Sequence, residues 1–348
     1  MTRLSSVPTT SAVPTTSAVP TRDAATRPPR RTRGLLRFVG IVGIVMSAAL
    51  IAGAATNLLL ERAEQSQIAP YGQRVDVDGG TLNVVQNRHS GPPLVLLTGL
   101  GTAAPGLDFA PLIRQLDDYS VTVVEEFGYG YSDQNAPART VENITAELHD
   151  VITQLDIPQP YTLIGHSIAG FYTLHYAHTY PSEVAAVVGI DPTVPAAKAE
   201  TATPAADLSA SAGPNWQRML STTGLVRVAN TLAPTLAEPA GDAFTASERE
   251  RIRLMTSWNF GNDAVVNETA LMGSNAQKLQ DISYPADLPV LTFLASESLT
   301  TIPHWRELHQ TQLQNVTRHE LVELDGGHYL HWTQSDTMAA TITAFLAG

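Results

Sequence analysis

The sequence predicts an α/β domain: a mostly parallel sheet with helices on both faces and a helical cap inserted between two strands. Three observations support this fold class. Short segments of strand character alternate with amphipathic helical segments through most of residues 71–348, which is typical of a sheet built from βαβ units. The alternation is interrupted once, between Asp191 and Pro289. The composition, with 43% hydrophobic and 16% charged residues, is that of a globular protein with a substantial core.

The N-terminal segment has a different character. Residues 1–33 consist mainly of Pro, Thr, Ser, Ala and Arg, so we expect a disordered basic tail. Residues 34–60 are interpreted as a transmembrane anchor or a signal segment. Within them, Phe38–Leu60 contains 23 residues without a charge, and such a run spans roughly 34 Å as a helix, enough to cross a bilayer core.

Two fates of this segment remain open. Ala52-Gly53-Ala54 fits the small-residue pattern of a signal cleavage site, but the apolar run exceeds the ~7–15 residues usual for a signal peptide. An uncleaved membrane anchor is therefore favoured, and a secreted product is the alternative. Arginines before the apolar run predict a cytoplasmic N-terminus, so the domain that follows is expected outside the membrane.

The elements of the domain follow in order from residue 71. A hairpin comes first, because Asp78-Gly79 supplies the positive φ that a tight turn requires. The later strand segments are short and mostly rich in Val, Leu and Ile; they are 93–99, 120–128, 161–165, 184–191, 289–295 and 318–327. The helical segments between and after them are 107–116, 141–157, 168–180, 304–315 and 335–347.

The interruption predicts a cap at about residues 192–286. It opens with an Ala-rich stretch and continues with helical segments at 215–220, 247–258 and 275–282. An insertion at the carboxyl end of a strand lies where ligands bind in open α/β sheets, so we expect it to cover a site. Four large apolar side chains in the cap suggest an apolar lining for that site: Trp216, Met219, Trp258 and Phe260.

Charge and cysteine content exclude several classes of function. The net charge is −12, although residues 1–60 hold seven arginines against one aspartate. The strongly acidic body argues against nucleic acid as the main partner. The absence of cysteine excludes disulfides, a thiol nucleophile and thiolate metal sites.

The stretch YTLIGHSIAG, residues 161–170, carries the main indication of chemistry. It places Ser167 where a buried strand turns sharply into a helix, with small residues on both sides. Such a turn is typical of a nucleophile elbow, in which the serine projects free and the helix N-terminus faces a developing negative charge. Ala169 stands where the motif usually has glycine, and Gly170 follows one step later.

A serine hydroxyl attacks only when a base takes its proton. His328 is the predicted base, because Gly326 and Gly327 let its loop reach over the sheet edge after the last strand. His331, three residues later, is interpreted as a polar residue at the mouth of the site or on the approach to the last helix.

The oxyanion of an acyl-transfer intermediate needs two backbone donors. The amide of Ile168, directly after the serine, is the first candidate. The amide of Leu100 is the second, since Gly99 and Gly101 on either side allow the backbone to approach closely.

These features resemble the α/β-hydrolase superfamily over about residues 71–348. The resemblance is carried by GHSIAG (165–170), EEFGYGYSD (125–133), YPSEVAAVVGID (180–191) and GGHYLHW (326–332). Thr98-Gly99 replaces the His-Gly that often opens the oxyanion loop, and the special elbow of proline iminopeptidases is missing. A serine at the elbow also argues against epoxide hydrolases and haloalkane dehalogenases, whose attacking group is an aspartate.

The resemblance leaves two candidates for the acid. In most of the superfamily the acid follows the strand that reads PVLTFLA here, and Glu297 stands near that position. A subset of the superfamily instead has a Val-Asp-Pro-type sequence after the preceding strand, which is similar to Ile190-Asp191-Pro192. Asp191 is favoured, and Glu297 is the alternative.

We therefore expect a membrane-anchored serine hydrolase that cleaves an ester or related acyl bond of a small-molecule substrate through an acyl-enzyme. Neither a metal nor an organic cofactor is implied by the resemblance. An amidase or peptidase on the same fold is an alternative, and so is a non-catalytic binding protein of that fold.

Overall fold

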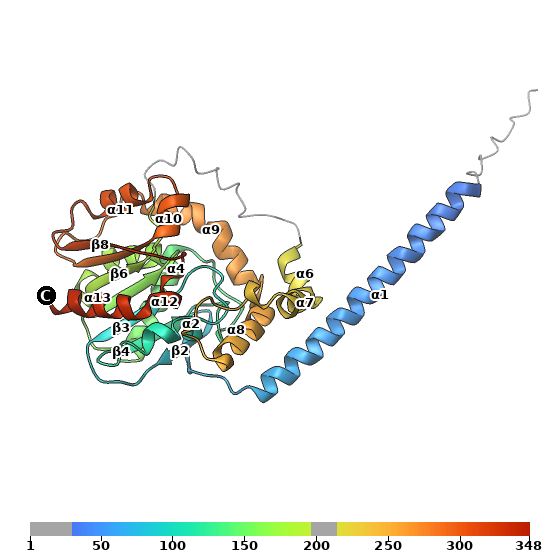
Figure 1. Cartoon of the computed structure of the whole chain (residues 1–348), viewed down its shortest axis with the longest axis horizontal. Coiled ribbons are helices and arrows are strands. Elements are labelled where there is room, and N and C mark those ends of the chain that lie inside the picture. The colour runs from blue at the N-terminus through green and yellow to red at the C-terminus, as the bar shows by residue number, and fades with distance from the viewer. Residues whose placement is uncertain (1–29, 196–213) are drawn as a thin grey trace, which may run out of the picture. The chain divides into compact units, whose positions relative to one another are not determined.

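The computed structural model describes residues 30–195 and 214–348 (Figure 1). Residues 1–29 of the predicted tail and the Ala-rich start of the cap, residues 196–213, lie outside the described ranges. The chain divides into two compact units, residues 1–49 and residues 50–348.

Helix α1 (Arg30–Gln67) contains the apolar run. It begins at Arg30, so it includes the last four residues of the segment predicted as a disordered tail. The apolar run nucleates the helix, and arginine, a good helix former, lets it continue toward the N-terminus. An 18-residue window within Arg37–Gln67 has a mean hydropathy of 2.3, so this stretch is long and apolar enough to cross a membrane.

The second unit contains an eight-stranded sheet in the order β1-β2-β4-β3-β5-β6-β7-β8. The strands are β1 (Gln73–Val77), β2 (Gly80–Gln86), β3 (Pro93–Leu97), β4 (Ser120–Glu125), β5 (Tyr161–His166), β6 (Val184–Ile190), β7 (Val290–Ala295) and β8 (His319–Leu324). The pairs β1–β2 and β2–β4 are antiparallel, and all other pairs are parallel. This arrangement confirms the predicted fold class, including the leading hairpin.

Helices cover the sheet on both faces (Figure 1). On one face, α4 (Val141–Gln154) and α5 (Ala169–Thr179) bury their apolar sides in the larger core cluster. On the other face, α3 (Ala110–Ile113) and α13 (Ser335–Ala347) pack in a second cluster with Leu94, Val188 and Phe293. Burial on both faces explains why the central strands read as continuous apolar runs.

The helix predicted at residues 107–116 is broken in the structure. It forms two short helices, α2 (Pro105–Asp108) and α3, with Phe109 between them at φ −85° and ψ 0°. Pro111 has no N–H for the hydrogen-bond ladder, and its ring hinders continuation of a preceding helix. The broken segment places Phe109 in the core, where it is fully buried.

The insertion between β6 and β7 contains no strand in its described parts, residues 191–195 and 214–289. Its helices are α6 (Trp216–Thr222), α7 (Leu225–Leu232), α8 (Ala246–Asn259) and α9 (Asp263–Leu279), with a 3₁₀ turn at Pro234–Leu236. Three further helices follow near the sheet edge: α10 (Ser296–Thr301), α11 (Trp305–Leu313) and α12 (Leu330–Thr333). Side chains of α8 and Phe244 form a small apolar cluster with Ala104 from the loop after β3.

Candidate active site

Ser167 occupies the turn between β5 and α5 at φ +55°, in the left-handed region that a non-glycine residue rarely adopts. Its neighbours explain the small residues of the motif. A Cβ at Gly165 would lie 2.9 Å from Thr173 Cγ2, and a Cβ at Gly170 would lie 2.5 Å from the Thr193 carbonyl oxygen. The surrounding backbone thus holds Ser167 in a strained conformation, as is common for residues at functional sites.

His328 and Asp191 lie 137 residues apart in the chain and are brought together by the fold. The distance between His328 Nδ1 and Asp191 Oδ2 is 2.6 Å. Asp191 directly follows β6 and is completely buried, whereas the His328 side chain is 39% exposed. Because Nδ1 bonds the carboxylate, Nε2 is the ring nitrogen left to exchange a proton with another group.

Asp191 accepts three further hydrogen bonds. The Ser298 hydroxyl donates to Oδ2 at 2.5 Å. The Trp305 indole N–H donates to Oδ1 at 2.8 Å, and the Ala295 amide donates to the same oxygen at 3.2 Å. Burial by itself raises the pKa of Asp191, but the hydrogen bonds from His328, Ser298 and Trp305 outweigh it and hold the pKa below its usual value. The carboxylate is therefore ionised at neutral pH.

Glu297, the alternative acid, has a different environment. It is exposed in the first turn of α10, and its amide donates to the Gly326 carbonyl at 3.2 Å. Within residues 30–195 and 214–348, its carboxylate forms no hydrogen bond to His328. Of the two candidate carboxylates, Asp191 is the one paired with the histidine.

His166 links the elbow to the histidine loop. Its ring is buried, 4.7 Å from the His328 ring between centroids, and its Nε2 lies 3.2 Å from the His328 carbonyl oxygen. Burial, together with His331 and His328 nearby, holds the pKa of His166 well below its usual value. The ring is therefore neutral, and Nε2–H donates to the carbonyl of His328, which fixes the loop beside Ser167.

The two predicted oxyanion donors flank the serine. Gly99 packs so closely that a Cβ there would lie 2.7 Å from His166 Nδ1 and 3.0 Å from Ser167 Cβ. This contact brings the loop that carries Leu100 against the elbow that carries Ile168. In the described part of the chain, neither the Leu100 amide nor the Ile168 amide donates a hydrogen bond to another protein group.

A buried polar cluster supports the oxyanion loop from behind. The Gly101 amide donates to the Tyr129 hydroxyl at 3.1 Å, and that hydroxyl donates to Glu268 Oε2 of α9 at 2.7 Å. Glu126 is buried beside the Arg139 guanidinium, 3.7 Å away. Burial first, and the Glu268 charge second, raise the pKa of Glu126 well above its usual value.

His331 occupies the second of its two predicted positions, the approach to the last helix, and not the mouth of the site. It lies on α12, is completely buried, and its Nε2 is 2.7 Å from Asp108 Oδ2. Trp332 donates to the other oxygen of the same carboxylate at 2.8 Å. The aspartate on α2 compensates the burial of these two polar rings, so His331 anchors the chain after the His328 loop.

A cleft of about 280 Å³ opens beside the oxyanion loop. Gly101–Ala104 and Asp108 form one side, Thr235–Glu238 of the cap form another, and Tyr329 and Trp332 contribute aromatic surface. The apolar cap residues predicted to line the site do not line this cleft: Trp216, Met219 and Phe260 are exposed, and Trp258 is buried elsewhere. Their positions depend on helix packing that no local pattern specifies.

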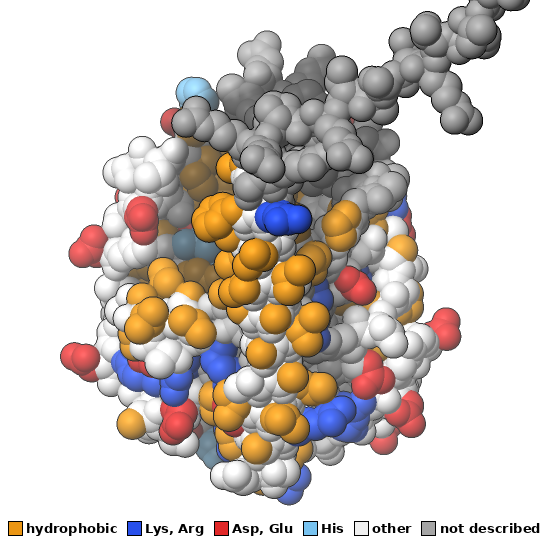
Figure 2. Space-filling model, turned by 90° about the vertical axis from the view of Figure 1, so that its right-hand side faces the viewer, with side chains coloured by type: hydrophobic (Ala, Val, Ile, Leu, Met, Phe, Trp, Pro, Cys, Tyr) orange, Lys and Arg blue, Asp and Glu red, His pale blue; other side chains and the backbone are white. Residues whose placement is uncertain are grey.

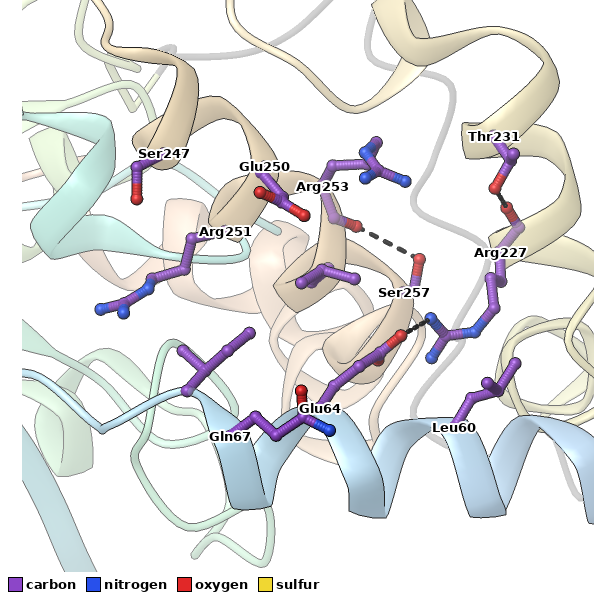
Figure 3. Close-up of a pocket in the computed structure, with 12 residues that line it drawn as sticks. Leu60, Glu64, Gln67, Arg227, Thr231, Ser247, Glu250, Arg251, Arg253 and Ser257 are labelled. Atoms are coloured by element: carbon purple, nitrogen blue, oxygen red, sulfur yellow. Dashed lines mark hydrogen bonds and ion pairs between the residues drawn. The ribbon is translucent and has the colours of Figure 1, made fainter.

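A larger pocket of about 490 Å³ lies elsewhere in the second unit and contains none of the predicted site residues (Figure 3). It is formed by the C-terminal turns of α1 together with α7 and α8. Arg227 of α7 crosses one side of it to reach Glu64 of α1.

Sequence reasoning missed the two side chains that hold Asp191. Ser298 and Trp305 lie 107 and 114 residues after the aspartate. The only available signal was general: a carboxylate at the end of a buried strand requires hydrogen-bond donors. That signal does not indicate which donors fold against it.

Comparison with known proteins identifies the family. The alpha/beta hydrolase fold family matches residues 92–335. The uncharacterized protein YbdG of Bacillus subtilis is 30% identical over 129 residues, which cover 37% of this chain and 40% of YbdG. The uncharacterized protein C23C11.06c of Schizosaccharomyces pombe is 27% identical over 210 residues, 58% of this chain and 36% of that protein. The alignments thus span well under half of the length of either relative.

Solved structures show the same fold. Epoxide hydrolase A from Mycobacterium thermoresistibile superposes with a TM-score of 0.60 and 19% identity, covering 80% of this chain and 99% of that one. A thermophilic esterase from Thermogutta terrifontis gives a TM-score of 0.58 and 18% identity, covering 79% and 98%. At such identities the likeness concerns the fold alone. With an eight-stranded sheet, an elbow after β5 and a family match over most of the domain, this chain belongs to the alpha/beta hydrolase fold family.

Proposed function

We propose that the protein is a serine hydrolase that cleaves an ester or related acyl bond through an acyl-enzyme. The observation that carries the proposal is the 2.6 Å pair between His328 and a fully buried, ionised Asp191. The chain also holds Ser167 in an elbow, and the residue before it, His166, bonds the His328 carbonyl. The hydrolase structures of the same fold, which include an esterase and an enol-lactonase, support the reaction class by analogy only.

In the proposed reaction, Ser167 Oγ attacks the acyl carbon while His328 Nε2 takes the serine proton. Asp191 stabilises the imidazolium that forms, because its carboxylate bonds Nδ1. The Leu100 and Ile168 amides bind the oxyanion. The C–O bond to the alcohol then breaks, and the leaving oxygen receives the proton from Nε2. A water molecule, deprotonated by the same histidine, releases the acid and restores Ser167.

The proposed location is the membrane, with the hydrolase domain on the extracytoplasmic side. The support is the length and hydropathy of α1 and the arginines that precede its apolar run in the sequence. An anchored chain should remain in the membrane fraction after alkaline carbonate washing, with its C-terminal domain open to external protease. A soluble exported product that begins near Ala55 would replace the anchor with a cleaved signal.

A fluorophosphonate probe tests the chemistry directly. The full chain should be labelled at Ser167, and Ser167→Ala should abolish labelling while its thermal unfolding stays close to that of the parent. Ser298→Ala is a useful second variant, because it removes a partner of Asp191 but leaves the nucleophile in place. It should still be labelled, more slowly. Equal labelling of Ser167→Ala and the parent would exclude Ser167 as the nucleophile.

Matched p-nitrophenyl esters and p-nitroanilides of the same acyl groups then separate an esterase from an amidase. Ester turnover that exceeds anilide turnover by several orders of magnitude supports the proposal, and the reverse order would assign an amidase.

A further inference from the structure

The cap carries a group of large apolar side chains that face solvent. On α7, Leu225, Val228 and Leu232 are 47%, 53% and 81% exposed. Their spacing of three and four residues places them on one side of the helix. The other members are Trp216 and Met219 of α6 and Leu236 of the 3₁₀ turn, and these six residues are called the cap surface below.

A group of large apolar side chains exposed together on a protein often marks an interaction site. Figure 2 shows the molecule from the side that bears α1, whose hydrophobic side chains form the column in the middle of the view. Each of the six side chains is at least 47% exposed.

The C-terminal part of α1 is attached to the same cap helices. Asn57 is only 5% exposed; its Nδ2 donates to the Ser221 carbonyl at 3.2 Å, and its Oδ1 accepts from Arg227 Nε at 2.8 Å. Glu64 forms an ion pair with Arg227 at 2.6 Å and accepts from the Trp258 indole at 2.9 Å. These paired polar groups fix the position of α6 and α7 along this part of α1.

Backbone packing adds a contact higher on α1. A Cβ at Gly53 would lie 2.8 Å from the Thr223 carbonyl oxygen, at the turn between α6 and α7. The cap therefore touches α1 from Gly53 onward, and it does so inside the apolar run, which ends at Leu60.

The position of these contacts along α1 determines how deep the cap helices α6 and α7 lie relative to a membrane that α1 crosses. The first charged residue after the run is Glu61, and about 20 helical residues cross a hydrocarbon core of about 30 Å. Gly53–Leu60 occupies the last ~10 Å of the run at 1.5 Å per residue. If these turns lie in the outer leaflet, then α6 and α7, attached to them, lie at the boundary between headgroups and acyl chains.

We propose that the cap surface docks on the outer leaflet of the bilayer that α1 crosses. The proposal rests on the anchor part of the proposed function. Trp216 suits the interface because tryptophan is enriched at membrane–water boundaries. Two cap polar groups at this depth, Arg227 and the Ser221 carbonyl, form hydrogen bonds to Asn57 and Glu64 of α1, which lowers the cost of placing them at the boundary.

Docking also relates the membrane to the cleft. Leu236 belongs to the cap surface, at 69% exposure, and lines the cleft beside the oxyanion loop. The cleft therefore opens next to the lipid boundary. An acyl substrate dissolved in the bilayer could reach it without crossing bulk water.

The experiment uses the full chain in phospholipid vesicles. Because the chain has no cysteine, single cysteines accept an environment-sensitive fluorophore without background. Val228→Cys and Leu232→Cys report on the cap surface, and Val45→Cys reports on the apolar run of α1. Gln310→Cys on α11 is the matched exposed-helix control, since α11 lies away from α6 and α7 in Figure 1.

Docking predicts that labels at positions 228 and 232 lose about half of their fluorescence to lipids with a shallow nitroxide, since interfacial helices bury their apolar face by ~5–10 Å. The label at position 310 should stay unquenched. Quenching at position 45 without quenching at either cap position would refute docking and leave the anchor intact. No quenching at position 45 by lipids with a nitroxide deep in the acyl chain would refute both. The labels at positions 228 and 232 could instead be shielded from solvent equally in vesicles and in lipid-free detergent, with crosslinking between copies. That result would assign the cap surface to a second copy of the chain and overturn the proposal.

Discussion

Replacing Asp191 by asparagine should reduce kcat by ~10³–10⁴-fold, and the structure shows how. Each carboxylate oxygen accepts two hydrogen bonds: Oδ1 from Trp305 and the Ala295 amide, Oδ2 from His328 and Ser298. In asparagine, one oxygen becomes an NH₂ group that donates instead of accepting. The substitution retains shape and removes both the charge and half of the acceptor capacity.

The two possible orientations of the amide are not equivalent. If NH₂ takes the Oδ1 position, it faces the Trp305 indole and the Ala295 amide, which are donors that cannot accept. If it takes the Oδ2 position, the Ser298 hydroxyl can rotate, and His328 can accept at Nδ1 by moving its proton to Nε2. In the first orientation two N–H donors face the NH₂ group, whereas in the second orientation none does. We therefore expect the second orientation to dominate. It produces the imidazole tautomer that is unable to take the proton of Ser167.

The assay is kcat/KM on one p-nitrophenyl ester, with thermal unfolding as a check of the fold. Glu297→Gln is the matched control and should change kcat/KM by less than about tenfold, because an exposed charge is screened by solvent. Retention of most activity in Asp191→Asn, with a large loss in Glu297→Gln, would refute the reasoning and move the acid to Glu297.

Acid titration provides an independent check on Asp191. Its pKa is lowered in the folded state, so the ionised form stabilises the fold above the unfolded-state pKa of about 3.9. That contribution is lost as the pH falls through the lower, folded-state pKa. The free energy of unfolding of Asp191→Asn should therefore decrease less on acidification below about pH 4 than that of the parent.

Two further predictions concern the oxyanion loop and the buried carboxyl behind it. Gly99→Ala should lower kcat by ~10²-fold, since its Cβ would lie 2.7 Å from His166 Nδ1 and displace the loop. Gly101→Ala is the control, because its Cβ meets nothing within 4 Å. Its positive φ should cost only ~1 kcal/mol of backbone strain. Equal activity losses in both variants would rule out the contact as the cause. For Glu126, whose pKa is raised, the folded state keeps a proton that the unfolded chain has lost above about pH 4.3. The free energy of unfolding of the parent should thus decrease as the pH rises from there toward the folded-state pKa. Glu126→Gln should make this decrease smaller in urea unfolding measured from pH 4 to 8. If the free energy of unfolding of Glu126→Gln decreases with pH as steeply as that of the parent, another group causes the decrease.

Local patterns in the sequence determined much of the fold. The alternation of apolar strands with amphipathic helices predicted the mostly parallel sheet, because each element depends on residues close to it in the chain. The positions of Ser167 and His328 followed in the same way, from small residues around a tight turn and glycines in a loop. The break of the helix at Pro111 shows the limit even here, since the periodicity around it was helical while the ring stops the backbone ladder.

Tertiary structure alone decided which side chains meet. The carboxylate beside His328 lies 137 residues before it in the chain, and both strand ends were within reach as far as the sequence showed. The placement of β7 beside β6, with α10 and α11 folded over their carboxyl ends, turned Ser298 and Trp305 toward Asp191 and left Glu297 in solvent. The attachment of α1 to the cap through Asn57 and Glu64 is of the same kind. Hydrogen bonds of this sort form only where the packed backbone brings a donor within about 3 Å of an acceptor, and no pattern of neighbouring residues encodes that distance.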